Sequence, residues 1–222
     1  MRAPAVGLLT EVKRRSPSKG DIAAGLDAGE QARRYMAGGA AGISVLTEPD
    51  HFCGSIDDLV AAQKATALPT LKKDFHVAPI QLIEARAFGA SAALLIARAL
   101  HPDSLAEMMQ VGAELGLELL VEVRDEDELQ LAIDLGATMI GVNNRNLETL
   151  EIDPTTCDRL IPMIPGDAIA IAESGVNTRW DVERYASVGA DAVLVGSSLS
   201  SAENPEAATR AIVGVSRRER AR

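Results

Sequence analysis

The sequence predicts a single α/β domain over residues 1–222, folded as a closed (β/α)8 TIM barrel. Short apolar runs alternate eight times with longer amphipathic stretches, which is typical of parallel strands joined by crossover helices. A Gly-Ala pair, beginning at Gly39, Gly89, Gly136 and Gly189, precedes every second expected strand. The spacings of 50, 47 and 53 residues each span two strand-helix units, and this even repeat favours a barrel over an open doubly wound sheet.

The expected strands and helices follow one another in strict alternation. The strands are the apolar runs Leu8–Lys13, Gly42–Leu46, Thr70–Asp74, Ala92–Ile96, Glu118–Val123, Met139–Asn143, Ala168–Glu173 and Ala192–Val195. The helices are the amphipathic stretches Asp27–Ala37, Ser55–Ala67, Pro79–Phe88, Asp103–Leu115, Asp125–Leu135, Thr155–Ile161, Asn177–Ser187 and Glu203–Val213. Residues that suit helix starts are Pro79, Asp103, Asp125 and Asn177, and residues that suit helix stops are Gly89, Gly116, Gly136 and Gly189.

The chain is acidic, with a formal net charge of −10 over 222 residues. Non-specific binding to nucleic acid or to anionic membranes depends on clustered Lys and Arg, so this balance disfavours both. Cys53 and Cys157 lack the spacing of a metal site, and neither an apolar run of about 18 residues nor a signal pattern is present. No glycine-rich dinucleotide fingerprint follows the first strand. These features predict a soluble, cytoplasmic protein in which an anionic small ligand would need a local basic pocket.

The first expected strand carries Glu11 and Lys13 at alternate positions within an apolar run. A strand has a period of two, so both charged side chains point to one face. Burying opposite charges is costly unless they pair or meet a ligand, which makes this face a candidate site. The alternative is an exposed edge strand whose two charges form a surface ion pair.

Polar and ionisable side chains recur near the ends of other expected strands. The third strand ends in a Lys-Lys-Asp sequence that contains Lys73, the fifth contains Glu122, and the seventh ends at Glu173. The sixth strand brings Asn143 and Arg145 to the same mouth. Because the carboxyl ends of the strands form the active-site face of such barrels, we interpret these residues as functional. Structural ion pairs could account for one or two of them.

The last two turns have the composition of a phosphate-binding site. Ser174 and Gly175 follow the seventh strand, and Gly196 and Ser197 follow the eighth. Barrels of this kind commonly bind phosphate there, through backbone N–H groups and the N-terminus of a short helix. The alternative is a pair of ordinary turns with glycines and capping serines.

Nine motifs occur together and in order along the chain. They are Glu-Val-Lys-Arg-Arg-Ser-Pro-Ser-Lys-Gly, Ile-Ser-Val-Leu-Thr-Glu, Phe-Cys-Gly-Ser, Leu-Lys-Lys-Asp-Phe, Ala-Leu-Leu-Ile, Leu-Val-Glu-Val, Gly-Val-Asn-Asn-Arg-Asn-Leu, Ala-Glu-Ser-Gly-Val and Leu-Val-Gly-Ser-Ser-Leu. From about Leu8 to Ile212 the chain resembles the indole-3-glycerol phosphate synthase family. The resemblance implies a (β/α)8 barrel of tryptophan biosynthesis. It implies a lyase that closes the pyrrole ring of 1-(2-carboxyphenylamino)-1-deoxyribulose 5-phosphate, losing carbon dioxide and water, without a metal or an organic cofactor.

The resemblance also implies roles for individual residues. Lys73 resembles the general acid, Glu122 the carboxylate that assists dehydration as acid or base, and Lys13 the lysine that meets the substrate carboxylate. Residues that match the positions orienting the two lysines and the sugar hydroxyls are Glu11, Asn143 and Glu173. Residues that match substrate-anchoring positions are Ser16 and Arg145, and those that match the apolar ring pocket are Phe52, Phe75, Leu94, Leu147 and Leu194. Residues that match the phosphate site are Ser174, Gly175, Gly196 and Ser197.

General chemistry provides a rationale for the same roles. Ring closure needs a carbonyl polarised by a proton donor, and a pocket of low dielectric constant eases decarboxylation. A lysine crowded by other cations loses its proton more readily, and Lys73 directly follows Lys72 in the sequence.

The chain departs from the family pattern in three places. The family usually carries a mostly helical N-terminal segment that covers the mouth, whereas residues 1–7 alone precede the first strand here. We therefore expect weaker substrate binding and less complete closure over the mouth. His76 follows Phe75 where an aliphatic residue is more usual, and Ser91 stands where Asp is frequent. The three histidines, His51, His76 and His101, are too scattered to form a cluster, and we expect them at the surface or in loops.

Two alternative functions stay open. One is a related barrel enzyme acting on a phosphorylated sugar, such as phosphoribosylanthranilate isomerase, which would need a Cys and an Asp at strand ends. Neither Cys53 nor Cys157 is at an expected strand end. The other is a weakly active or non-catalytic relative that binds a phosphate ligand, and the joint presence of Lys13, Lys73 and Glu122 argues against it. Whether the chain is the synthase or the related isomerase, we expect a phosphorylated small-molecule substrate. We also expect a monomer that binds neither nucleic acid nor membrane.

Overall fold

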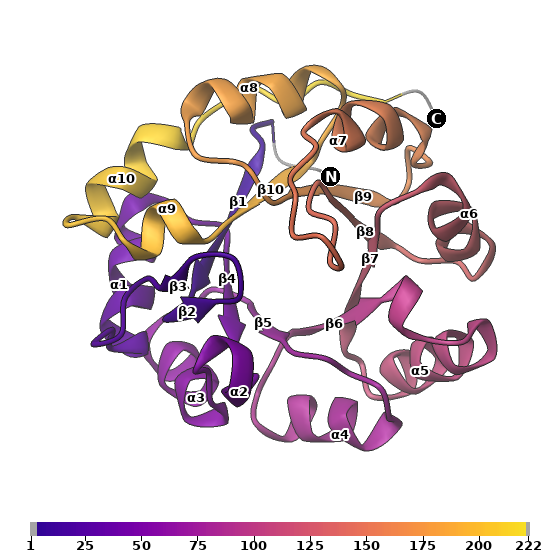
Figure 1. The fold of residues 1–222 in the computed structure, drawn as a ribbon, viewed down its shortest axis with the longest axis horizontal. Helices are drawn as coiled ribbons and strands as arrows, with labels where there is room; N and C mark the ends of the chain where they lie inside the picture. Colours follow the sequence, from indigo (N-terminus) through magenta and orange to yellow (C-terminus); the bar gives the residue numbers. More distant parts are fainter. Residues whose placement is uncertain (1–3, 221–222) are drawn as a thin grey trace.

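Eight parallel strands close into a barrel in the computed structural model, which describes residues 4–220 (Figure 1). The order around the barrel is β1-β10-β9-β8-β7-β6-β5-β4, so strands that follow one another along the chain are neighbours. The strands are β1 (Gly7–Val12), β4 (Gly42–Leu46), β5 (Thr70–Lys73), β6 (Ala92–Ile96), β7 (Glu118–Val123), β8 (Met139–Asn143), β9 (Ile169–Glu173) and β10 (Ala192–Val195). The predicted (β/α)8 fold is confirmed.

Helices surround the barrel on the outside (Figure 1). The longer ones are α1 (Ala28–Gly38), α3 (Ile56–Ala65), α4 (Pro79–Ala87), α5 (Pro102–Glu114), α6 (Glu126–Asp134), α7 (Thr155–Leu160), α8 (Arg179–Ser187) and α10 (Pro205–Ile212). Short elements within the connections are β2 (Arg15–Ser16), β3 (Gly20–Asp21), α2 (Pro49–Phe52), η1 (Ala97–Ala99), η2 (Ile161–Met163) and α9 (Ser197–Ser200). The short elements were not predicted, because segments of two to four residues carry no periodicity that a sequence pattern can reveal.

The helix boundaries agree with the sequence signals at most ends and differ by one or two residues at others. For example, α3 ends two residues before the expected Ala67, and α10 begins two residues after the expected Glu203. Gly89, Gly136 and Gly189 adopt φ of 87°, 78° and 99°, the left-handed conformation that glycine tolerates best after a helix. The predictions that Asp103 and Asn177 begin helices are wrong by one or two residues. His101 caps α5 and Pro102 is its first residue, because Pro fits the first helical position. Thr178 caps α8 by accepting a hydrogen bond from the backbone N–H of Asp181.

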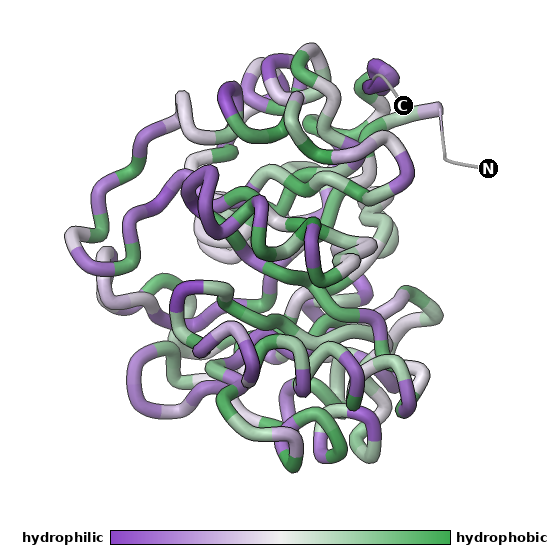
Figure 2. The backbone as a smooth tube through the Cα atoms, turned by 90° about the vertical axis from the view of Figure 1, so that its right-hand side faces the viewer, coloured by the Kyte–Doolittle hydropathy of each residue, from purple (hydrophilic) through white to green (hydrophobic). Residues whose placement is uncertain are grey.

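The core has two parts, one inside the barrel and one between the barrel and the helices. Alternate residues of the strands point inward, and the inner cluster contains Leu71, Leu94, Ile96, Leu120, Ile171, Ala192 and Leu194. The outer cluster is larger and joins the other face of the strands to helix residues such as Tyr35, Leu59, Leu82 and Leu105. In Figure 2, segments of hydrophobic residues gather in the centre of the molecule, and loops of hydrophilic residues protrude on one side.

The end of the chain closes the amino-terminal side of the barrel. Ala5 and Ser216 form an antiparallel bridge, and Val6 donates a hydrogen bond to the Val215 carbonyl at 2.8 Å. Arg217 and Arg220 then pair with Asp191, at the start of β10, at 2.7 and 2.9 Å. These contacts fix the segment after α10 against the strands.

Candidate active site

A cavity of about 310 Å³ opens at the carboxyl ends of the barrel strands. It is lined by every residue that the sequence predicted for the site except Glu173: the charged and polar residues Glu11, Lys13, Ser16, Lys73, Glu122, Asn143 and Arg145, the apolar residues Phe52, Phe75, Leu94, Leu147 and Leu194, and the turn residues Ser174, Gly175, Gly196 and Ser197. Glu173 lies behind the cavity wall with 1% of its surface exposed. The barrel therefore brings residues from all parts of the chain to one mouth.

Lys73 lies between two buried carboxylates inside the mouth. Its Nζ is 3.0 Å from Glu173 Oε2 and 3.4 Å from Glu11 Oε1. Glu11 also contacts Lys13 through its other oxygen, at 2.5 Å. Because β1, β5 and β9 all end here and their inward positions alternate, the three strands place these four side chains together. The predicted shared face of Glu11 and Lys13 is confirmed, and it is the inner face of a closed barrel and not an exposed edge.

The charges of this cluster stabilise one another. Burial alone would lower the pKa of Lys73, but the carboxylates of Glu173 and Glu11 outweigh it and raise that pKa above its ordinary value. Burial alone would raise the pKa of Glu11, and Lys13 and Lys73 outweigh it and lower that pKa. Lys73 is therefore an ammonium group at neutral pH, held by carboxylates. The expectation that neighbouring cations would promote loss of its proton is wrong.

Lys72 has a different environment from Lys73 because adjacent strand residues face opposite sides. Its Nζ lies outside the barrel, 3.1 Å from Asp74 Oδ2, 3.3 Å from Glu84 Oε2 and 3.3 Å from His76 Nε2. The ammonium group thus has three partners and only 1% of the side chain is exposed. The Lys-Lys pair of the sequence does not form a cationic pair in the fold.

His76 lies in a loop, as one of the two expected placements, and it is buried and not at the surface. Only 3% of it is exposed, and its Nδ1 is 2.7 Å from the Leu94 carbonyl. That carbonyl can only accept, so Nδ1 carries the proton and Nε2 accepts from Lys72. Burial, followed by the charge of Lys72, lowers the pKa of His76 to about 4. His51 and His101 are exposed as expected.

Glu122 differs from the other carboxylates of the mouth. Burial, followed by the nearby Glu173 carboxylate, raises the pKa of Glu122 to about 7. Asn143 donates a hydrogen bond to Glu122 at 2.8 Å and accepts one from the Arg145 backbone N–H at 2.9 Å. This carboxyl group can therefore exchange a proton near neutral pH, which suits an acid or a base.

The aromatic side of the cavity is formed by Phe52 and Phe75. Their ring centroids are 6.2 Å apart, and the planes are tilted by 51°. The Lys13 ammonium lies 6.0 Å from the centroid of Phe52. Leu94 and Leu194 close the floor. An aromatic ring with an attached carboxylate would fit between these rings and Lys13.

The two predicted phosphate turns lie side by side at the ends of β9 and β10. Ser174 and Gly175 adopt φ of 63° and 81°, so two successive residues are left-handed. Gly196 precedes α9, whose first N–H groups, like those of any helix, have no partner within the helix. Asn144, which is fully buried, donates hydrogen bonds to the Ser174 carbonyl and to Tyr185, both at 2.9 Å. Asn144 thus holds the first turn in place, and successive left-handed residues can present backbone N–H groups to an anion.

Some residues of the cavity were not predicted. Leu46 and Ile96 come from the ends of β4 and β6, and Lys19 comes from the β2–β3 hairpin. Leu46 and Ile96 follow the inward alternation of their strands, a signal that could have identified them. Lys19 could not be placed, because its position depends on how the hairpin folds over the mouth.

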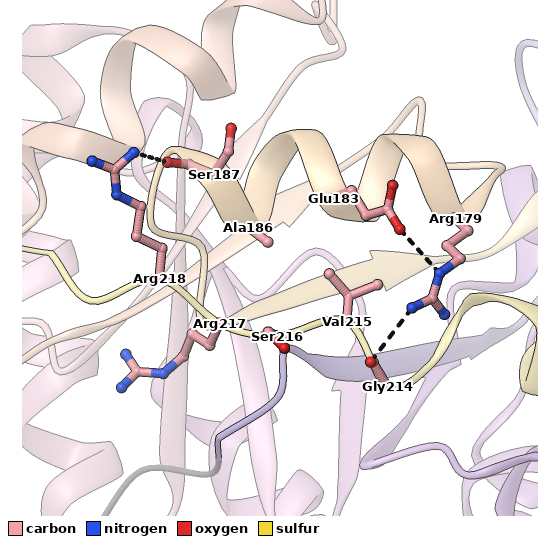
Figure 3. Close-up of a pocket in the computed structure, with 9 residues that line it drawn as sticks. All are labelled: Arg179, Glu183, Ala186, Ser187, Gly214, Val215, Ser216, Arg217 and Arg218. Carbon is pink, nitrogen blue, oxygen red and sulfur yellow. Dashed lines mark hydrogen bonds and ion pairs between the residues drawn. The ribbon is translucent and has the colours of Figure 1, made fainter.

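A second hollow, of about 390 Å³, lies outside the barrel between α8 and the segment after α10 (Figure 3). Its arginines bind the protein itself: Arg179 donates to the Val213 carbonyl at 2.8 Å and contacts Glu183 at 3.0 Å, and Arg218 donates to the Ser187 carbonyl at 3.2 Å. This hollow contains none of the predicted site residues. Within residues 4–220, no group of three or more His, Cys, Asp or Glu is arranged to hold a metal ion.

The fold and the cavity define a class of protein: a (β/α)8 barrel with a cluster of ionisable residues, an aromatic pocket and a pair of glycine-containing turns at the carboxyl ends of its strands. Residues 2–212 match the family described as indole-3-glycerol phosphate synthase. The chain belongs to that family.

Relatives in the same family are similar over most of their length. The chain is 50% identical over 214 residues to an indole-3-glycerol phosphate synthase of Nocardioides sp., covering 96% of this chain and 82% of the relative. It is 49% identical over 210 residues to the protein of the same name in Rhodococcus opacus, covering 95% and 78%. It is 48% identical over 213 residues to indole-3-glycerol phosphate synthase 1 of Streptomyces coelicolor, covering 96% and 79%.

Among solved structures, thiamine phosphate pyrophosphorylase from Pyrococcus furiosus has a similar fold. The TM-score is 0.69 at 15% identity, with 93% of each chain covered. At that identity the similarity concerns the fold alone. In the part of the chain that the structure describes, no helix is both long and apolar enough to cross a membrane.

Proposed function

We propose that this protein is an indole-3-glycerol phosphate synthase, a carboxy-lyase. It would convert 1-(2-carboxyphenylamino)-1-deoxyribulose 5-phosphate into indole-3-glycerol phosphate, carbon dioxide and water. The observation that carries the proposal is the position of Lys73, a buried ammonium group between Glu11 and Glu173 on the floor of the cavity. Family membership supports the same reaction.

Lys73 would act as the general acid of ring closure. The aromatic carbon that bears the carboxylate attacks the ketone carbon of the sugar chain, and a new carbon-carbon bond forms. The ketone oxygen gains negative charge in this step, and Lys73 donates a proton to it. The carboxyl group then leaves as carbon dioxide, its bonding electrons restoring the aromatic ring. The two carboxylates that flank Lys73 keep it protonated before substrate binds.

Glu122 would assist the dehydration that follows. The hydroxyl group formed in the first step leaves as water, and a proton is lost from the ring system as the pyrrole double bond forms. A carboxyl group whose pKa lies at about 7 can transfer a proton in either direction near neutral pH. Asn143 fixes its orientation through the 2.8 Å hydrogen bond.

The remaining residues of the cavity would hold the substrate by its two ends. Lys13 would bind the carboxylate of the aromatic ring, which Phe52 and Phe75 would enclose. Arg145 and Ser16 would anchor the substrate from the loops after β8 and β1. The phosphate would bind the backbone N–H groups of two turns, formed by Ser174 and Gly175 and by Gly196 and Ser197. Holding both ends would place the ring carbon against the ketone.

The test is an assay of the purified protein with the carboxyphenylamino-deoxyribulose phosphate, monitored by the absorbance and fluorescence of the indole product. We expect indole formation with release of one carbon dioxide per turnover. Phosphoribosylanthranilate, the substrate of the related isomerase, should not react, because Cys53 is exposed beyond α2 and Cys157 is buried beside the Val142 carbonyl. Consumption of phosphoribosylanthranilate without indole formation would overturn the proposal.

We extend the proposal to the state of the protein in the cell, a cytoplasmic monomer without nucleic acid. The acidic chain offers little to a polyanion, and each residue assigned a role in the reaction comes from the same chain. Light scattering during size-exclusion chromatography should give a mass near 23.4 kDa. A dimeric mass with full activity would remove the monomer from the proposal and leave the reaction intact.

A further inference from the structure

Two glycines of the barrel interior lie directly against the carboxylates that hold Lys73. Gly141 is in β8, opposite Ile171 of the neighbouring strand β9, and the side chain of Glu173, two residues further along β9, reaches back to it. Gly196 follows β10, next to Glu11 of β1. A Cβ atom on Gly141 would overlap Glu173 Oε1 and lie 3.1 Å from its carboxyl carbon. A Cβ atom on Gly196 would overlap Glu11 Oε2 and lie 3.0 Å from its carboxyl carbon.

We propose that Gly141 and Gly196 are positioning residues that provide the space for Glu173 and Glu11 to grip Lys73. The proposal rests on the proposed function, because it concerns the same general acid. Each glycine acts through the carboxylate that it faces and contacts no reacting atom in this role.

The backbone conformation does not explain a glycine at position 141. Its φ is not among the positive values, so an L side chain could adopt the same backbone. Glycine in the interior of a strand is unfavourable for the chain, because it loses more conformational freedom on folding than other residues. Position 141 is also fully inside the barrel, where apolar side chains normally fill the space. The close approach of the Glu173 carboxylate is the feature of the fold that requires a missing side chain there.

A methyl group at position 141 would move the end of Glu173 and leave the barrel in place. The overlapping atom is the far end of a flexible side chain, which can rotate away. The Leu120 side chain, 3.1 Å from the added Cβ, is the other neighbour and is also able to shift. The 3.0 Å contact between Glu173 Oε2 and Lys73 Nζ would lengthen or break. The consequence should appear in proton transfer before it appears in folding.

The experiment is a double-mutant cycle between Gly141→Ala and Glu173→Ala, measured by kcat and KM for indole formation. Gly141→Ala should lower kcat by roughly tenfold to a hundredfold, change KM less, and leave the melting temperature within a few degrees, as expected for a displaced general acid. In the Glu173→Ala background, Gly141→Ala should have no further effect on kcat, since the carboxylate that it displaces is gone. Gly196→Ala should show the same coupling to Glu11→Ala in kcat, whereas its KM should also rise, because Gly196 belongs to the proposed phosphate turn.

Gly7→Ala is the matched control. Gly7 also lies in a barrel strand, and a Cβ there would meet Ala192 Cβ at 3.4 Å, an ordinary contact. It should leave kcat unchanged. If Gly141→Ala lowers kcat equally with and without Glu173, or acts no more strongly than Gly7→Ala, the positioning role is wrong.

A structural readout separates this inference from the proposed function. In a crystal structure of Gly141→Ala, the distance from Glu173 Oε2 to Lys73 Nζ should exceed about 4 Å, the limit of an ion pair. If the unmodified protein does not form indole but this distance lengthens, the proposed function fails and the spatial role of Gly141 stands. If the distance stays at its original value, the inference fails whatever the enzyme does.

Discussion

Both ends of the barrel bury carboxylates, and the two ends balance them differently. At the mouth, three carboxylates, Glu11, Glu122 and Glu173, face the two ammonium groups of Lys13 and Lys73. The carboxylates outnumber the ammonium groups, and burial, followed by the Glu173 carboxylate, raises the pKa of Glu122 to about 7. The mouth therefore contains a carboxyl group, that of Glu122, which can gain or lose a proton near neutral pH.

The amino-terminal end has the opposite balance. Asp191 pairs with Arg217 at 2.7 Å and with Arg220 at 2.9 Å, and accepts a hydrogen bond from the Ala170 backbone N–H at 2.9 Å. One carboxylate thus meets two guanidinium groups that carry a fixed charge. Charge pairing at this end favours stability, whereas the mouth gathers ionisable groups whose charges are not balanced.

The largest effect should come from removing the central cation of the mouth. Lys73→Ala should lower kcat by about 10²–10⁴-fold, the usual contribution of a general acid. Folding should persist, because the barrel is made by the strands. Lys64→Ala, in the exposed part of α3, is the control and should leave kcat unchanged. A loss under roughly tenfold with intact circular dichroism would remove Lys73 from the role of general acid.

At the other end, the corresponding change should reduce stability and spare catalysis. Asp191→Ala removes the buried carboxylate that Arg217 and Arg220 share, and breaking a buried pair typically costs about 3–5 kcal/mol. Urea unfolding should show this loss, while kcat of the folded protein should stay within about twofold because the mouth is untouched. Glu219→Ala removes the exposed second partner of Arg217, at 3.5 Å, and should cost less than about 1 kcal/mol. Equal losses from the two variants would contradict the division between the ends.

The sequence was sufficient for the features that depend on local rules. Glycine after a helix and a period of two along a strand are local signals, so Gly89 and Gly189 marked turns and Glu11 and Lys13 were correctly placed on one face. Once the barrel was predicted, all the strand ends had to meet at one mouth, and the site followed.

Features that depend on tertiary contacts could not be predicted. Nothing around His76 in the sequence indicates that a loop histidine packs against the Leu94 carbonyl, 18 residues further along the chain. Likewise, the adjacent residues Lys72 and Lys73 read as a cationic pair, whereas strand alternation places them on opposite faces of β5. The carboxylates that raise the pKa of Lys73, Glu173 and Glu11, come from strands distant in the sequence. Gly141 reads as an ordinary strand residue because the side chain that needs its space lies on β9.

The pH dependence of stability tests the charge surplus of the mouth. The folded pKa of Glu122 lies above its unfolded value, so its contribution to stability is complete below the unfolded value and is lost as pH rises through about 7. His76 acts in the opposite direction between about pH 4 and 6.5, since its folded pKa is lowered to about 4. The informative quantity is therefore the difference in unfolding free energy between the protein and Glu122→Gln. Relative to the variant, the protein should lose on the order of 2 kcal/mol from pH 5 to pH 8. A constant difference would mean that Glu122 titrates normally.

The smallest expected effect concerns the proposed phosphate turns of the mouth, where backbone N–H groups and not an excess of cations should attract phosphate. Inorganic phosphate or sulfate resembles the end of the substrate and should bind the turns at Ser174–Gly175 and Gly196–Ser197 weakly. At ten times its dissociation constant, an anion that binds only the folded state stabilises it by about 1.4 kcal/mol. The melting temperature should then rise by a few degrees.

Chloride at the same ionic strength controls for screening, because a general salt effect would act through both anions. Phosphate should also raise the apparent KM without changing kcat, as expected for competition at the substrate's phosphate position. One of the turns contains Gly196, which lies against Glu11 of the Lys73 cluster. The same titration on Lys73→Ala therefore separates anion binding from acid catalysis: the shift in melting temperature should persist when turnover is lost. If phosphate and chloride act equally on both melting temperature and KM, the turns do not form a phosphate site, and the anionic end of the substrate must bind through Lys19 or Arg145 instead.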